Sequence, residues 1–178
     1  MDKNSLKNLL LKKDPRSEGT LADIQEQIKF QKEIRADLNI VSTMISQIEW
    51  MRKQCYDLKD MLSAGTGTKE MMAAIDEMDK KLRSVEDELF QNTIAEGDSK
   101  SFRLPQKLYC KLSVLAGDVG GSVDFAPNKQ QREVYAVLKE RLKEQKSRFD
   151  GLLNTDLPAF NNFLKNNNVI GLVAPLIK

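Results

Sequence analysis

The stretch Thr20–Ser63, TLADIQEQIKFQKEIRADLNIVSTMISQIEWMRKQCYDLKDMLS, decides the fold of this chain. Its apolar residues recur at steps of mostly three and four, the period of one face of an α-helix. The positions expected to face inward are Leu21, Ile24, Ile28, Ile34, Leu38, Val41, Ile45, Ile48, Cys55, Leu58 and Leu62. A continuous helix of this length would span about 65 Å. It would be either a coiled-coil arm or the spine of an elongated bundle.

Signals for helix starts and stops divide the rest of the chain. Thr20 with Asp23 is typical of a capped helix start, and a second helix begins near Thr68 and runs to about Gly97. The joint between these two helices is only residues 64–67, so we expect them to be antiparallel neighbours.

Two more helices follow the loop at residues 98–104. Pro105 suits the first turn of a third helix that ends in the glycine-rich residues 117–121, with an apolar stripe at Leu104, Leu108, Leu112 and Leu115. Asn128 and Gln131 predict a capping box for a fourth helix. Its core face is expected to be Val134, Leu138, Leu142, Phe149 and Leu152. Pro158 then kinks or restarts this helix, which continues to about Lys165.

These patterns predict an all-α fold, an elongated antiparallel up-and-down bundle of about four helices. The bundle comprises residues 18–166. Residues 1–17, with the apolar run Leu9-Leu10-Leu11, form an extended N-terminal segment or the remnant of a preceding β-domain. Residues 167–178 form an irregular apolar tail laid on the bundle.

Composition and charge narrow the functional classes. The chain has 178 residues, 40% of them hydrophobic and 30% charged, with a net charge of +2. This mixture is typical of a soluble globular protein, and interleaved charges argue against nucleic-acid binding. No apolar run is long enough for a membrane span, and no signal peptide is visible. The basic residues at the start are interpreted as a solvated tail rather than a phosphate-binding arm: Lys3, Lys7, Lys12, Lys13 and Arg16.

The sequence contains no histidine, which removes Ser–His and Cys–His nucleophile pairs and histidine metal sites. Ser113 and Ser122 therefore have no evident base. Cys55 and Cys110 are too few and too far apart for a zinc site. We interpret them as buried small side chains, with a disulfide as the alternative.

Several acidic residues have the spacing that an acid–base pair or a carboxylate metal site needs. They are Glu33 with Asp37, Asp76, Glu77 and Asp79, and the run Glu86-Asp87-Glu88. Most lie off the apolar stripe among Lys80, Lys81 and Arg83, so a solvated helix face is the preferred interpretation. The sequence thus assigns no catalytic, cofactor-binding or metal-binding residue, and it predicts no cofactor.

Aromatic residues and methionines could form a binding face instead. Trp50, Tyr56, Tyr109 and Tyr135 are amphipathic, and Trp50 beside Met51 could anchor a partner, although such residues more often cover a core edge. Methionines gather in the first two helices, where they usually fill gaps in a core. They are Met44, Met51, Met61, Met71, Met72 and Met78.

Four groups of residues carry a family resemblance. They are Asp14-Pro15-Arg16 with 22–27; 103–108 with Leu112 and Leu115; 127–131 with Val134-Tyr135; and 156–161. Together they resemble the C-terminal helical region of bacterial sortilin-like, BNR-repeat β-propeller proteins, often labelled glycosyl hydrolases. The resemblance implies a helical segment that follows the propeller in an exported parent, and hence a periplasmic or secreted location. It transfers no catalytic residue.

The sequence therefore predicts a non-catalytic accessory bundle, not an enzyme. Its partner would be the preceding domain of the parent chain or a second copy of itself. The alternative is a free-standing adaptor that binds a partner helix along the hairpin of the first two helices.

Overall fold

A computed structural model describes residues 12–65, 67–91 and 104–175 of the chain. Its elements are α1 (Leu21–Ser63), α2 (Lys69–Leu89), α3 (Leu108–Gly121), α4 (Lys129–Gly151), the π-helical turn η2 (Leu152–Asp156) and α5 (Leu157–Asn166). Because α4, η2 and α5 follow one another without a break, they act as one long helix. The predicted all-α, elongated up-and-down bundle is confirmed. The strand or remnant expected around Leu9–Leu11 lies outside the described residues.

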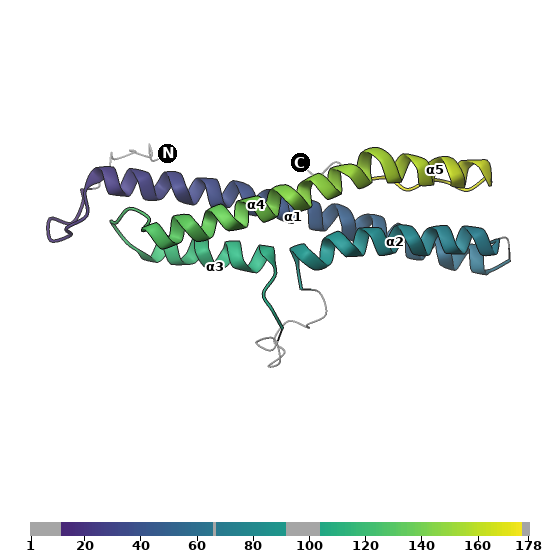
Figure 1. Cartoon of the computed structure of the whole chain (residues 1–178), viewed down its shortest axis with the longest axis horizontal. Coiled ribbons are helices and arrows are strands. Elements are labelled where there is room, and N and C mark those ends of the chain that lie inside the picture. The colour runs from purple at the N-terminus through teal and green to yellow at the C-terminus, as the bar shows by residue number, and fades with distance from the viewer. Residues whose placement is uncertain (1–11, 66, 92–103, 176–178) are drawn as a thin grey trace, which may run out of the picture.

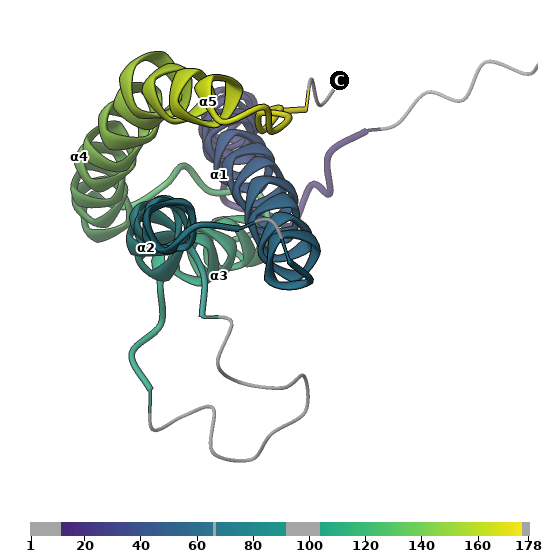
Figure 2. The same cartoon turned by 90° about the vertical axis from the view of Figure 1, so that its right-hand side faces the viewer.

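The helices are arranged along one long axis (Figure 1). α1 runs the length of the bundle, and α2 returns antiparallel along its C-terminal half, as the short joint predicted. α3 packs on the N-terminal half of α1, so α2 and α3 lie end to end. The continuous α4–α5 helix covers both, with α4 against α3 and α5 against α2; Figure 2 shows the same packing along the axis.

The buried face of α1 follows a seven-residue repeat. One set of positions lies seven apart: Gln27, Ile34, Val41, Ile48, Cys55 and Leu62; a second set adds Phe30, Met44 and Met51. Such a heptad keeps one seam facing the neighbouring helices over a long distance. Leu21 and Ile28, which we expected to face inward, are exposed because they fall outside both sets.

Both expected helix caps on the long helices are present. Thr20 and Asp23 form a capping box at the start of α1, and Asn128 with Gln131 forms one at the start of α4. Each box satisfies backbone N–H groups that would otherwise lack acceptors.

Two other predicted helix ends are wrong. α2 ends at Leu89 rather than Gly97, because Phe90 is extended and its ring packs edge-on against Tyr109, with centroids 6.3 Å apart. α3 begins at Leu108, three residues after Pro105. Its other end, at Gly121, lies within the glycine-rich stretch where it was expected, and Val119 in the last turn is fully buried.

The buried amide of Gln27 holds the end of α3. Its Nε2 donates to the carbonyl oxygens of Val119, at 2.8 Å, and Val123, at 3.1 Å. Val123 has a φ of 41°, a conformation that is strained for a β-branched residue. The side chain of α1 thereby gives a second donor to two carbonyls at and just beyond the end of α3, which also accept from the backbone N–H groups of Ser122 and Phe125.

The π-turn keeps the long helix in register with the core. In α4 the buried residues follow steps of three and four up to Phe149 and Leu152, but the next buried residue, Leu157, comes five positions later. The Leu157 N–H donates to the carbonyl of Leu152, which adds one residue to that turn. Pro158, which has no N–H, follows directly, so the widened turn accommodates the proline and the helix continues without a new cap.

The described part of the tail, residues 167–175, has no regular structure and lies between α5 and α1. Asn161 of α5 exchanges two hydrogen bonds with the backbone of Leu172, at 2.7 and 2.9 Å. Gln54 of α1 does the same with Val173, at 2.8 and 3.0 Å. Two side-chain amides thus bind this strand-like segment from opposite sides.

We expect truncations at fully buried positions of α1 and α2 to cost more than truncations beside them. Ile48→Ala and Leu82→Ala each remove a fully buried side chain and should lower the free energy of unfolding by about 2–5 kcal/mol. Ile45→Ala, at a partly buried position, should cost less. Urea denaturation measures this, with the exposed Lys80→Ala as a control expected within about 0.5 kcal/mol. The reverse order would contradict the assigned core face.

Deleting Asn154 from the π-turn should strongly destabilise the protein. The step from Leu152 to Leu157 becomes four residues, so Leu157 stays on the core face, but Pro158 then lies inside a regular α-helix. Its ring would clash with the carbonyl four residues earlier, at a cost of about 3 kcal/mol or more. Asn154→Ala keeps the residue count at this exposed site and should change stability by less than about 0.5 kcal/mol. Equal denaturation midpoints for the two variants would show that the extra residue is not needed.

Candidate functional site

The most buried group of charges lies between α1 and α2 and consists of Arg52, Asp79 and Glu86, which we call the Arg52 cluster. Arg52 Nε donates to Asp79 Oδ1 at 2.8 Å, and Arg52 Nη1 donates to Glu86 Oε2. The Glu86 side chain is 2% exposed and that of Arg52 is 13% exposed. Arg52 Nη2 also donates to the hydroxyl of Tyr56 at 2.8 Å, so every nitrogen of this guanidinium has an oxygen acceptor.

The electrostatics of the Arg52 cluster favour a structural role. Burial alone would lower the pKa of the guanidinium, but the bond to Asp79 and the charge of Glu86 outweigh it, so the pKa of Arg52 lies above its usual value. Beside it, burial and then the charge of Asp79 raise the pKa of the Cys55 thiol to about 12. The thiol is therefore protonated at neutral pH and is a poor nucleophile.

The other candidate acids are separated along the bundle. Asp76 pairs with Lys59 at 2.5 Å, Asp87 with Arg83 at 3.8 Å, and Glu88 with Lys107 at 3.8 Å. These pairs are mostly exposed and each contributes about 0–1 kcal/mol. Glu77 lies on the exposed face of α2, as the spacing predicted.

Asp37 and Glu33 lie on the side of α1 that faces α4. The Tyr135 hydroxyl donates to Asp37 Oδ2 at 2.8 Å, and its ring packs edge-on against Phe30, with centroids 4.9 Å apart. Burial and then the bond to Asp37 raise the pKa of Tyr135, with a further contribution from the charge of Glu33. Asp37 thus sits in the helix seam because a buried phenol satisfies it.

Cys55 and Cys110 are both free thiols. Of the methionines, Met44, Met51, Met71 and Met78 are buried in the core, Met72 packs against it, and Met61 is exposed. Trp50 is 54% exposed while its neighbour Met51 is fully buried. The aromatic and methionine residues of the first hairpin therefore divide between core and surface.

An exposed apolar surface lies where α3 and α4 pack side by side. We define it as the valine face: Val114, Val134 and Val137, which are 57%, 49% and 55% exposed. Val134 was expected in the core, but Gln131 and Tyr135 of the same turn are buried instead, while the expected Leu138 is buried. Val114 and Val134 line a groove of about 410 Å³ whose floor includes Leu115 and Leu138.

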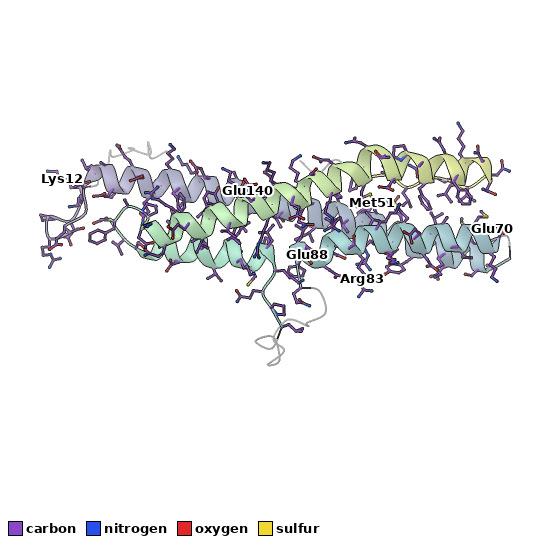
Figure 3. All side chains as sticks on the ribbon, viewed as in Figure 1. Lys12, Met51, Glu70, Arg83, Glu88 and Glu140 are labelled. Carbon is purple, nitrogen blue, oxygen red and sulfur yellow. The ribbon has the colours of Figure 1, made fainter. Side chains whose placement is uncertain are left out.

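A polar cavity of about 500 Å³ lies where α2 ends and α3 begins. We call it the gap pocket, and Figure 3 labels Glu88 at the end of α2 beside it. Its lining comes from the last turns of α2, residues 105–111 and one side of α4. It shares Gln106 and Lys111 with the groove of the valine face, so the two hollows are adjacent. Sequence reasoning missed this pocket, because its basic residues are spread over some forty positions.

Comparisons with protein-family models, with curated proteins and with solved structures find no match to this chain. Among residues 12–65, 67–91 and 104–175, no group of three or more histidine, cysteine or acidic side chains is placed to hold a metal ion. In the same ranges no helix is both long enough and apolar enough to cross a membrane.

Removing the centre of the Arg52 cluster should be costly. Arg52→Met leaves Glu86 buried without its cation, so the free energy of unfolding should fall by about 3–5 kcal/mol. Adding Glu86→Gln to that variant removes the unpaired charge and should restore part of the loss. The control is Lys53→Met, at the residue next to Arg52, which breaks an exposed ion pair with Asp57. It should change stability by about 0.5 kcal/mol or less. Guanidinium denaturation would refute the interpretation if Arg52→Met and Lys53→Met behaved alike.

Proposed function

We propose that this chain is a non-catalytic helical association module that binds a second copy of itself through the valine face. The observation that carries the proposal is the exposure of three valines on adjoining turns of α3 and α4, beside an apolar groove of about 410 Å³. Clustered exposed apolar residues next to a groove commonly mark a protein contact. α3 and α4 each also have a complete stripe of buried residues, so the exposed valines are additional to the core.

The charges around the valine face suit a second copy. Along the same side of α4, Glu140 and Glu144 flank Arg141 and Lys143. A two-fold interface brings a surface against itself, so it requires both signs of charge on one face. An antiparallel pair of α4 helices can meet this requirement around Val137.

The acidic residues support the non-catalytic part of the proposal. Asp79 and Glu86 are both bound to Arg52, and Asp37 is bound to Tyr135. An acid–base pair needs carboxylates that can reach a substrate, with pKa values shifted toward neutrality. These side chains instead connect helices within the bundle.

Two other forms of association remain proposals. In the first, which the family resemblance suggests, the bundle packs on the preceding domain of an exported β-propeller parent. In the second, an adaptor, a partner helix binds along the α1–α2 hairpin, where Trp50 and Met61 are exposed. We favour the valine face because its residues are adjacent to a groove, whereas Tyr56 on the hairpin is already bound to Arg52.

Sedimentation velocity of the full chain, over about a hundredfold range of concentration, tests the proposal. The chain should dimerise reversibly, and Val134→Asp or Val137→Asp should weaken the dimer by about tenfold or more, because each buries a charge at an apolar contact. Ile170→Asp is the matched control, since Ile170 is a more exposed apolar residue on the tail. A chain that stays monomeric, or valine variants that dimerise like Ile170→Asp, would contradict self-association.

A further inference from the structure

The gap pocket exists because the middle of the bundle is interrupted. α2 ends at Leu89 and α3 begins at Leu108, and their ends face each other along α1 (Figure 1). α4 passes the interruption without a break, so its side chains from Arg141 to Arg148 form one wall of a hollow where a continuous helix would otherwise pack.

Positive charge dominates this hollow. Lys107, Lys111, Arg141 and Arg148 line it, against the carboxylates of Glu88 and Glu144. A cavity wall of low dielectric strengthens the field of such a cluster compared with the same charges on an open surface.

Most of these cations are not neutralised by the protein. Lys107 is 3.8 Å from Glu88, a long contact for an ion pair. Arg148 donates to neutral acceptors, the amide oxygen of Gln145 at 2.8 Å and the hydroxyl of Ser84 at 3.3 Å. Within the described residues, Lys111 and Arg141 have no hydrogen bond or ion pair. The pocket therefore retains capacity for an anion.

The donors in the gap pocket suit a phosphoryl group. Two guanidinium groups offer paired N–H donors that match adjacent phosphate oxygens, and two ammonium groups add point charges. In addition, Lys107 at the N-cap of α3 makes no side-chain capping bond, so the first N–H groups of that helix lack a side-chain acceptor. A volume of about 500 Å³ has room for an anion of one or two phosphoryl groups.

We propose that the gap pocket binds a phosphoryl group of a small free phosphate compound, held by Lys107, Lys111, Arg141 and Arg148. This site is separate in function from the valine face. It places a ligand site at the break between α2 and α3.

Titration of the full chain with pyrophosphate and with inorganic phosphate, followed by NMR at constant ionic strength, tests the site. Saturable shifts should appear at the amides of residues 105–111 and 141–148. Lys111→Gln and Arg141→Gln should each weaken binding by about tenfold or more, because each removes a charged donor. Glu144→Gln should tighten binding, because it removes a competing carboxylate, and a merely structural role would not produce that gain.

Lys146→Gln is the matched control, because Lys146 lies on the same helix, pairs with Asp150, and lines neither the pocket nor the charged side of α4 assigned to self-association. Its affinity for pyrophosphate should equal that of the unmodified chain. The proposal is overturned if no saturable binding occurs, or if Lys146→Gln weakens binding as much as Arg141→Gln. Citrate bound as tightly as pyrophosphate would also overturn it, since carboxylates would then serve equally well.

Discussion

The seven-residue seam of α1 is the constraint on which the rest of the structure depends. Its buried positions from Gln27 to Leu62 present one continuous face over 36 of the 43 residues of α1, and both α2 and α3 pack on it. A heptad pattern has slightly fewer residues per turn than a straight α-helix. The neighbouring helices must therefore wrap around α1 to stay in contact with its seam. A long seam of this kind does not by itself choose a register, since sliding by seven residues brings similar side chains together.

Polar residues in or beside the seam supply that choice. Gln27 binds the end of α3, Asp37 accepts from Tyr135 of α4, and Arg52 binds Asp79 and Glu86 of α2. A slip of one heptad would leave each of these groups buried without a partner, and each such group costs about 1–3 kcal/mol or more. Apolar residues therefore drive the helices together, and three polar residues on α1 fix where each partner helix lies along it.

Sequence reasoning found the helices because their signals are local. The caps at Thr20 and Asn128 and the three-and-four spacing depend on neighbours within a few residues, and the structure confirms them. The face was misjudged at Leu21, Ile28 and Val134 because a helix with many apolar residues offers two adjoining stripes, and only packing chooses between them. The Arg52 cluster was missed for a different reason. Nothing in the run Glu86-Asp87-Glu88 distinguishes the buried glutamate from its exposed neighbours, since its burial is decided by α1, 34 positions earlier. A signal for the π-turn did exist: the five-residue step from Leu152 to Leu157 beside Pro158.

The two continuous helices and the interrupted row of α2 and α3 have different consequences for function. α1 and the α4–α5 helix are continuous, so the length and stiffness of the bundle depend on them, and the one-residue adjustment at the π-turn preserves that continuity. The row formed by α2 and α3 needs no such continuity. Each of these helices has its own stripe of buried apolar residues, and each is bound by a polar side chain of α1. An interruption there costs little packing, and it opens a hollow lined by side chains from three helices.

Both surfaces that we propose as binding sites border the first half of α3 and the facing side of α4. The continuous helices thus fix the geometry of both sites, while the break between α2 and α3 provides the space that a ligand needs.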